Sequence, residues 1–186
     1  REKWAEFQKT APVERLVLLD ESSAKTNMTR LRGRSRGGSR CHAKSPCGHW
    51  NTLTLLSSIR FHGSTECIVV DGPLDRAMFS EYIAQVLCPT LRTNDIVIMD
   101  NLSAHKNPDV AAHIRKSGAE ILYLPPYSPD LNPIENMWSK VKQLLRGMEL
   151  RTYDALEKGI ARTLNMVCAR DAQGWFKNCG YELFQV

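Results

Sequence analysis

The chain has 186 residues, of which 42% are hydrophobic and 24% are charged. This length and balance are typical of one globular domain with a buried core and exclude a wholly disordered chain. No apolar run approaches the roughly 20 residues that span a bilayer. The charged start Arg1–Glu6 lacks the apolar stretch of a signal peptide, so we expect a cytoplasmic protein.

The first half of the chain predicts mainly strands. Residues 1–14 are expected to form a short helix and a linker. Residues 15–20 are expected to form an apolar strand in the centre of a sheet. Further strands are expected at residues 28–34 and 40–45, on either side of a glycine-rich turn, and at residues 50–62 and 67–70.

The second half of the chain predicts alternating helices and strands. The expected helices cover residues 75–88, 107–117, 133–146 and 152–169, and the expected strands cover residues 95–100 and 120–125. Strands that come first and then alternate with helices predict an α/β fold, with a mixed sheet and helices packed on its faces.

Positive charge is concentrated in one part of the chain. The formal net charge is only +5, but no acidic residue lies between Glu21 and Glu66. The same stretch holds eight basic residues: Lys25, Arg30, Arg32, Arg34, Arg36, Arg40, Lys44 and Arg60. A solvated loop would explain them, but alternating arginines on one side of a strand would also suit a phosphate backbone. We favour a polyanionic partner.

The six cysteines are scattered and form no CxxC pair, which favours reduced thiols. Cys41, His42, Cys47 and His49 lie close together in the sequence, and a zinc site there is conceivable. Their spacing fits no common structural zinc pattern, so we favour thiols without a metal.

Three carboxylates occupy matched positions. Asp20 and Asp100 each end a run of four apolar residues, and Glu135 lies where a helix is expected to begin. A carboxylate at the end of a buried strand is costly to desolvate unless a cation compensates it. If the two strands are parallel neighbours, their carboxylates meet at the carboxyl-terminal edge of the sheet. Together with Glu135 they would suit hard ions such as Mg²⁺.

Each of these carboxylates also has a structural interpretation. Asp20 and Asp100 could begin turns. Glu135 could belong to a capping box, because Asn132 is a good helix N-cap and Pro133 suits the first helical position. The local sequence leaves capping and metal binding equally open for Glu135.

The helix that carries Glu135 is expected to have two distinct faces. Ile134, Trp138, Val141 and Leu145 recur at helical spacing and should pack on the sheet. A second face carries Glu135, Ser139, Lys142 and Arg146, an order that suits a metal site continuing into a phosphate track. In the loop after Asp100, His105 could form a loop hydrogen bond or contact the phosphate or the metal ligands.

Three segments resemble the catalytic domain of DDE-type transposases: Leu18–Ser22, Ile98–Asn101 with His105, and Leu124–Glu135. The resemblance is to the bacterial insertion-sequence branch of the mariner-like superfamily. The 34 residues between Asp100 and Glu135 match the spacing typical of that superfamily. The Pro-rich block that ends at Glu135 is the most specific of the three segments.

The resemblance implies an RNase H-like catalytic domain over residues 15–186. It implies that Asp20, Asp100 and Glu135 are catalytic and bind two divalent ions, Mg²⁺ or Mn²⁺. One ion would activate the attacking oxygen and the other would stabilise the leaving oxygen. The enzyme would cleave double-stranded DNA at the ends of an element and join the freed 3′-hydroxyl to target DNA, with two copies of the chain acting together on the DNA.

The resemblance departs from the family pattern at the amino terminus. Family members carry helix-turn-helix modules there, whereas only 19 residues precede Asp20. We therefore expect residues 1–14 to be a helix and linker remnant, with no helix-turn-helix domain in this chain. DNA contacts, mostly independent of sequence, are expected from Arg30, Arg32, Arg34, Arg36, Arg40, His105, Lys142 and Arg146. Such a protein would associate with the nucleoid.

Two alternatives and one further surface follow from the sequence. A truncated copy could serve as a non-catalytic DNA-binding or assembly module, and an RNase H-like fold could also cleave RNA–DNA hybrids. The Pro-rich block before Glu135 argues against the second. Trp175, Phe176, Tyr181 and Phe184 could form an interface or close over the sheet as core.

Overall fold

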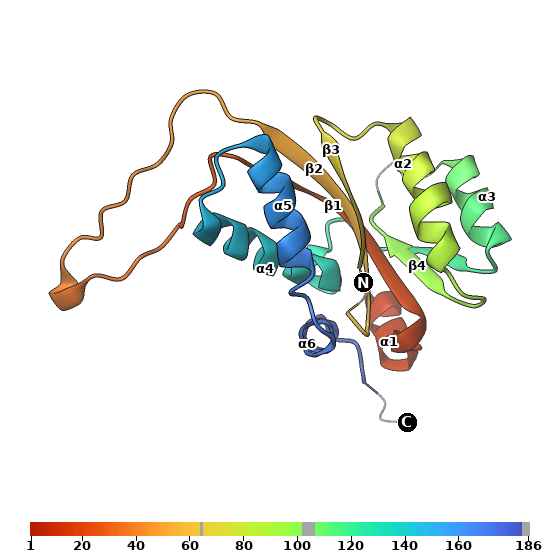
Figure 1. The fold of residues 1–186 in the computed structure, drawn as a ribbon. Helices are drawn as coiled ribbons and strands as arrows, with labels where there is room; N and C mark the ends of the chain where they lie inside the picture. Colours follow the sequence, from red (N-terminus) through yellow and green to blue (C-terminus); the bar gives the residue numbers. More distant parts are fainter. Residues whose placement is uncertain (64, 102–106, 184–186) are drawn as a thin grey trace.

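The computed structural model describes residues 1–63, 65–101 and 107–183. It confirms a mixed α/β sheet flanked by helices on both faces (Figure 1). The strand order is β3-β2-β1-β4-β5. Strands β1, β2 and β3 pair antiparallel, whereas β4 pairs parallel with β1 and with β5. The strands are β1 (Leu16–Lys25), β2 (Thr52–Arg60), β3 (Thr65–Asp71), β4 (Ile96–Met99) and β5 (Glu120–Tyr123).

Helices cover the two faces of the sheet unequally. Helices α1 (Glu2–Thr10), α4 (Pro133–Met148), α5 (Tyr153–Leu164) and α6 (Ala169–Asn178) contribute to the core on one face. Helices α2 (Arg76–Tyr82) and α3 (Pro108–Lys116) contribute to the core on the other face, and α2 continues as a π-helical segment over Ile83–Leu87. None of the helices among the described residues is both long and apolar enough to cross a membrane.

Strand β1 is the centre of the sheet, as its apolar run predicts. Successive side chains of a strand point to opposite faces, so Leu16 and Leu18 enter the core beneath α4 while Val17 and Leu19 enter the core beneath α2. All four side chains are at most 1% exposed. The strand continues five residues beyond the predicted end at Asp20, because Glu21–Lys25 remain paired with β2.

The two strands expected at residues 28–34 and 40–45 are not formed. Residues 26–51, here called the arm, leave the sheet after β1 and return to it at β2 as a long projection (Figure 1). The arm contains one short 3-10 turn, Arg36–Gly38, and no strand. Alternating residue types alone do not make a strand when no neighbouring strand offers backbone hydrogen bonds.

The helix predicted over residues 152–169 is wrong, because the chain forms two helices there. Helix α5 ends at Leu164, and α6 begins at Ala169. The second start is set by a capping box in which the Asp171 carboxylate accepts a hydrogen bond from the Cys168 backbone N–H at 3.0 Å. The sequence did not predict this second helix start because Cys is not a usual N-cap residue.

The aromatic residues near the carboxyl terminus are mainly core. Phe176 and Tyr181 are at most 2% exposed, and their ring centroids lie 5.5 Å apart. The Tyr181 hydroxyl donates a hydrogen bond to the carbonyl of Leu131 at 3.2 Å. Trp175 is half-buried, and Phe184 lies outside the described residues. The core interpretation is therefore confirmed for Phe176 and Tyr181.

Candidate active site

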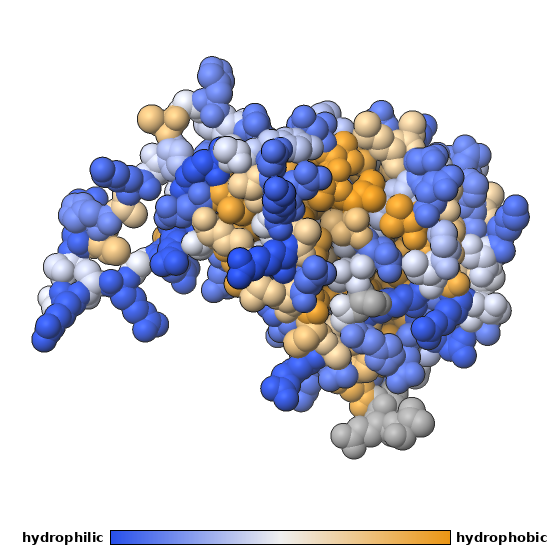
Figure 2. Space-filling view, in the orientation of Figure 1, coloured by the Kyte–Doolittle hydropathy of each residue, from blue (hydrophilic) through white to orange (hydrophobic). Residues whose placement is uncertain are grey.

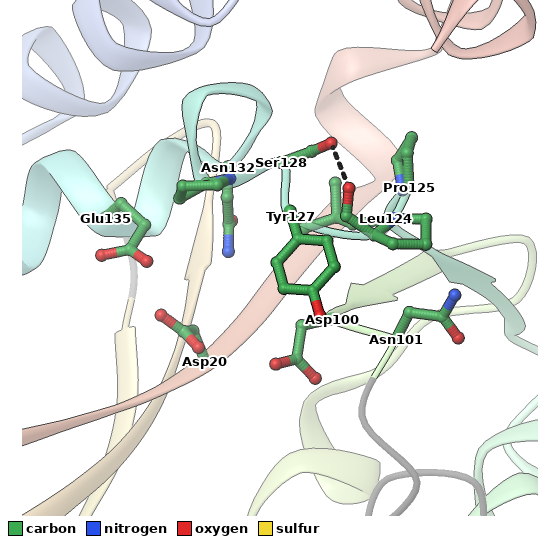
Figure 3. A pocket seen from close by; sticks show the side chains of 11 residues that line it. Asp20, Asp100, Asn101, Leu124, Pro125, Tyr127, Ser128, Asn132 and Glu135 are labelled. Carbon is green, nitrogen blue, oxygen red and sulfur yellow. Dashed lines mark hydrogen bonds between the residues drawn. The ribbon is translucent and has the colours of Figure 1, made fainter.

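The three predicted carboxylates line one cavity of about 340 Å³ beside the middle of β1 and the carboxyl-terminal end of β4. Asp20 belongs to β1, Asp100 directly follows β4, and Glu135 lies in the first turn of α4. Figure 3 shows their side chains facing the same space. Asn101, residues 124–129 and Asn132 complete the described lining.

Strand pairing explains why Asp20 and Asp100 converge. Strands β1 and β4 are parallel with Leu18 opposite Ile98, so two further residues along each strand bring Asp20 level with Asp100. Residues two positions apart share a face, and Leu18 and Ile98 both lie in the core beneath α4. The two carboxylates therefore lie on the side of the sheet that α4 covers.

Helix α4 brings the third carboxylate to this place. Ile134, Trp138 and Val141 are at most 2% exposed and pack in the core between α4 and the sheet, as their helical spacing predicts. This packing fixes the start of the helix next to β1. Glu135 is exposed at the cavity, and Figure 3 shows its carboxylate pointing toward that of Asp20.

The helix cap by the Asn132 side chain, which was the structural alternative for the start of α4, is not formed. The backbone carbonyl of Asn132 accepts a hydrogen bond from the Glu135 N–H at 3.1 Å, but the Asn132 side chain makes no cap hydrogen bond. Pro133, whose φ is preset for a helix, stands at the first helical position. Both Asn132 and Glu135 instead line the cavity.

Burial and neighbouring negative charge dominate the electrostatics of the cavity. Burial of the Asp20 carboxyl, followed by the nearby Glu135 charge, raises the pKa of Asp20 from its ordinary 3.8 to about 7. Asp100 and Glu21 raise this pKa further, whereas a hydrogen bond from the Glu21 backbone lowers it. The carboxyl therefore lies in a site that disfavours its own negative charge.

The donor atoms of the cavity fit a divalent cation. Carboxylate oxygens are the ligands that Mg²⁺ and Mn²⁺ prefer, and a cation would offset the Glu135 and Asp100 charges that contribute to the raised pKa of Asp20. Over residues 1–63, 65–101 and 107–183, no three His, Cys, Asp or Glu side chains are close enough to hold one ion as they stand. The donor set fits a metal ion, and metal binding would require the carboxylates to move closer together.

Arg1, which sequence reasoning did not single out, holds the Pro-rich loop over the cavity. One of its terminal nitrogens, Nη2, lies 2.7 Å from the Asp130 carboxylate and donates to the Tyr127 carbonyl at 3.1 Å. Its Nε donates to the Ser128 hydroxyl at 3.2 Å. Arg1 is separated from this loop by more than 120 residues of sequence. No local sequence pattern could therefore have predicted the contact.

Tyr127 is another lining residue that sequence reasoning did not assign. Its backbone has a φ of +52°, a conformation that non-glycine residues seldom adopt. The residue is 98% exposed, and Figure 3 shows its ring at the cavity near Asp100. An exposed aromatic ring held at the rim of a polar cavity is available to stack on a ligand.

The predicted DNA-contacting residues fall into separate groups. Arg34, Arg36 and Arg40 are exposed on the outer part of the arm, whose surface is largely hydrophilic in Figure 2. Arg30 and Arg32, at the base of the arm, line a second hollow together with Arg146 of α4. Lys142 is half-buried on α4 and is not among the residues that line this hollow. His105 lies outside the described residues.

Comparisons with known proteins agree with this geometry. The family model described as DDE superfamily endonuclease matches residues 15–157, and the chain belongs to that family. A curated relative is the Tcb1 transposase of a transposable element from Caenorhabditis briggsae, which is 32% identical over 81 residues. That match covers 41% of this chain and 30% of the relative, so the matched segment spans less than a third of the relative's length.

Solved structures share the fold at low sequence identity. The Mos1 transposase paired-end complex with the left transposon end superposes with a TM-score of 0.76 at 16% identity, covering 96% of this chain and 56% of that one. The Mos1 mariner paired-end complex with Mn superposes with a TM-score of 0.75 at 14% identity, covering 99% and 61%. The fold is therefore RNase H-like, as the resemblance implied. The relatives are of the Tc1/mariner type.

Proposed function

We propose that this chain is a transposase catalytic domain, formed by residues 15–186, that cleaves double-stranded DNA at the ends of an element and joins them to a target. The observation that carries the proposal is the meeting of Asp20, Asp100 and Glu135 in one cavity. Family membership supports endonuclease chemistry. The resemblance of residues 124–135 supports assignment to the bacterial insertion-sequence branch, which inverted repeats flanking the reading frame would establish.

The three carboxylates make this cavity the proposed metal-binding site. Asp20, Asp100 and Glu135 would hold Mg²⁺ or Mn²⁺, two ions to a site. Such ions would activate the attacking oxygen and stabilise the leaving oxygen of an in-line displacement at phosphorus. Divalent metal use is supported by the oxygen donors of the cavity and by the presence of Mn in the Mos1 complex.

The chain's own residues have distinct roles in this reaction. Burial and the Glu135 charge make the cavity poor at holding Asp20 as an uncompensated anion, so the metal-free site would repel a phosphodiester. The Pro-rich loop, held by Arg1, forms one side of the cavity. Water would be the attacking group in cleavage, and the freed 3′-hydroxyl would be the attacking group in joining.

DNA and a second copy of the chain are the proposed partners. Arg30, Arg32, Arg34, Arg36 and Arg40 of the arm, together with His105, Lys142 and Arg146, are proposed to contact phosphates. Two element ends must be joined in one event, which favours a dimer on DNA. The mass of the protein–DNA complex in solution tests the dimer.

Nicking of a supercoiled plasmid in Mn²⁺ tests the proposal. We expect the wild-type chain to nick the plasmid and Glu135→Gln to lose nicking while keeping its fold and its DNA affinity. Glu157→Gln, which changes an exposed carboxylate of α5, is the matched control and should nick normally. Retained nicking by Glu135→Gln would refute the assignment. DNA binding without nicking by any variant would favour a non-catalytic DNA-binding or assembly module.

A further inference from the structure

A second hollow of about 670 Å³ lies between the base of the arm and helix α4. We call it the arm groove and define it by Arg30, Arg32, Ser139, Gln143, Arg146 and Gly147. Three guanidinium groups and two neutral polar side chains line it together with Leu31 and Leu144, and no acidic residue is among the described lining residues. Among the described residues, none of the three arginines forms an ion pair.

The base of the arm is fixed in place, so the groove does not depend on a freely moving loop. The Arg151 guanidinium donates hydrogen bonds to the carbonyls of Thr26 at 3.2 Å and Met28 at 2.8 Å. The two ends of the arm are joined where the Thr26 N–H donates to the Asn51 carbonyl at 3.1 Å. Arg30 follows only two residues after Met28, and its position is therefore restricted.

Gly147 allows the arm to approach the helix closely. A Cβ atom at this position would lie 3.8 Å from Nε and Nη2 of Arg30. The guanidinium of Arg30 thus lies over the glycine on α4, near Arg146, which is the preceding residue of the helix. Arg30 and Arg146 line the same hollow, and like charges that share a hollow repel one another unless an anion compensates them, so an anion in the groove would be favourable.

The direction of α4 relates the groove to the carboxylate cavity. Glu135 and Ser139 are four residues apart on the helix, and Arg146 is seven residues beyond Ser139, so all three lie on one side. At 1.5 Å for each residue, Arg146 lies roughly 16 Å beyond Glu135 along the axis. A DNA duplex advances about 3.4 Å for each base pair, so the distance from Glu135 to Arg146 corresponds to about five base pairs, or half a helical turn, along a duplex parallel to α4.

From this placement we infer that the arm groove binds the sugar–phosphate backbone of the same DNA duplex whose phosphodiester enters the carboxylate cavity. The inference rests on the proposed function. The arm groove would fix the position of the DNA along its axis relative to the carboxylate cavity. Arg30, Arg32 and Arg146 contact phosphate oxygens, while Ser139 and Gln143 donate hydrogen bonds to them. The outer arginines of the arm are not part of this site.

Salt-dependent binding of a 30-base-pair duplex in EDTA tests the groove without requiring cleavage. Each phosphate contact that is lost lowers the slope of log K against log salt concentration by about 0.9. We expect the double variant Arg30→Gln/Arg146→Gln to lower the slope by about 2. The matched double variant Arg162→Gln/Arg170→Gln removes the same charge from exposed positions outside the groove and should lower it by less than half as much. Gln143→Glu, which adds a carboxylate among the arginines, should weaken binding at least tenfold.

Two results would overturn the inference. One is an equal loss of slope in both double variants, which would mean that attraction to DNA is spread over the surface. The other is no loss of affinity in Gln143→Glu. Tighter binding of an RNA duplex than of the DNA duplex would overturn the choice of DNA. Plasmid nicking by the wild type, with an unchanged salt slope in Arg30→Gln/Arg146→Gln, would leave the proposed function intact and refute only the role of the groove. A lowered slope in that variant without nicking by the wild type would support the groove and count against the proposed function.

Asn132 supports a second inference from a different observation. Three buried side-chain atoms among the described residues have no hydrogen-bond partner, and the Asn132 Oδ1 is the one whose residue lines the carboxylate cavity. The residue is 3% exposed, and Figure 3 shows its side chain pointing into the cavity, between Glu135 and Tyr127. A buried amide oxygen without a donor lowers stability, so this position is suited to a ligand that donates a hydrogen bond to the Asn132 Oδ1.

We propose that the Asn132 Oδ1 accepts a hydrogen bond from the attacking water or 3′-hydroxyl and so positions that group among the carboxylates. This role rests on the proposed function. Asn132→Leu, which has a similar volume and no polar atoms, should raise the thermal midpoint by a few degrees and lower nicking at least tenfold.

A capping role predicts the opposite effect of Asn132→Leu on stability. A lower thermal midpoint would therefore overturn the proposal whether or not the wild-type chain nicks DNA. Normal nicking by the variant would also overturn it. The control Asn178→Leu, at the exposed end of α6, should leave nicking unchanged.

Discussion

Removal of the Asp20 charge should stabilise the metal-free protein. The pKa of this carboxyl is raised from 3.8 to about 7, mainly by burial and then by the Glu135 charge. The folded protein therefore holds a proton on Asp20 between about pH 4 and pH 7 that the unfolded chain has released. Stability must fall as pH rises through this window and then level off above pH 7. At 1.36 kcal/mol for each pH unit, the full effect is up to about 4 kcal/mol.

Urea unfolding in EDTA at pH 5, 6 and 8 measures this effect. We expect Asp20→Asn to be more stable than the wild type by about 2 kcal/mol at pH 5, and by up to about 4 kcal/mol at pH 8. The control Asp71→Asn, at the exposed end of β3, should show no comparable gain. If Asp20→Asn were no more stable than the wild type at pH 8, or if the difference did not grow with pH, the electrostatic account of the cavity would be refuted.

Three further substitutions test the framework of the fold by urea or thermal unfolding. Arg60→Ala should lower the free energy of unfolding by about 3–5 kcal/mol. Its partner Asp95, 2.8 Å away and 3% exposed, would be left buried without a cation. A decrease below 1 kcal/mol would contradict this. Gly63→Ala should lower the thermal midpoint by several degrees, because φ is +84° and a Cβ would lie 2.7 Å from the Cys168 carbonyl carbon; an unchanged midpoint would show that the contact is not tight. Phe176→Ala should lower the free energy of unfolding by about 3–5 kcal/mol, since the ring is fully buried. A decrease as small as that of an exposed residue would contradict a place in the core.

The sheet and the carboxylate cavity could be predicted from the sequence because both depend on short-range patterns. The apolar runs before Asp20 and Asp100 define two buried strands, and parallel pairing brings Asp20 level with Asp100. The spacing of Ile134 and Trp138 then predicts the face of α4 that packs on the sheet. These patterns required no knowledge of distant contacts, and the three carboxylates line one cavity.

The arm and the loop over the cavity could not be predicted in the same way. The alternating arginines of the arm suggest a strand, but a strand needs a neighbouring partner, and the arm projects away from the sheet. The Asn132 side chain suggests a helix cap, yet it faces the cavity instead. Arg1 reaches the loop across the whole catalytic region. Each of these features depends on tertiary placement, which local propensity does not contain.

The central claim is that Asp20, Asp100 and Glu135 together bind divalent ions. Calorimetric titration of Mn²⁺ into the chain, with a DNA duplex present, tests this most directly when the wild type is compared with Asp100→Asn. We predict saturable binding in the wild type that Asp100→Asn loses. Equal binding by the two proteins, or no binding by the wild type in the presence of DNA, would contradict the assignment of this cavity as a metal-dependent active site.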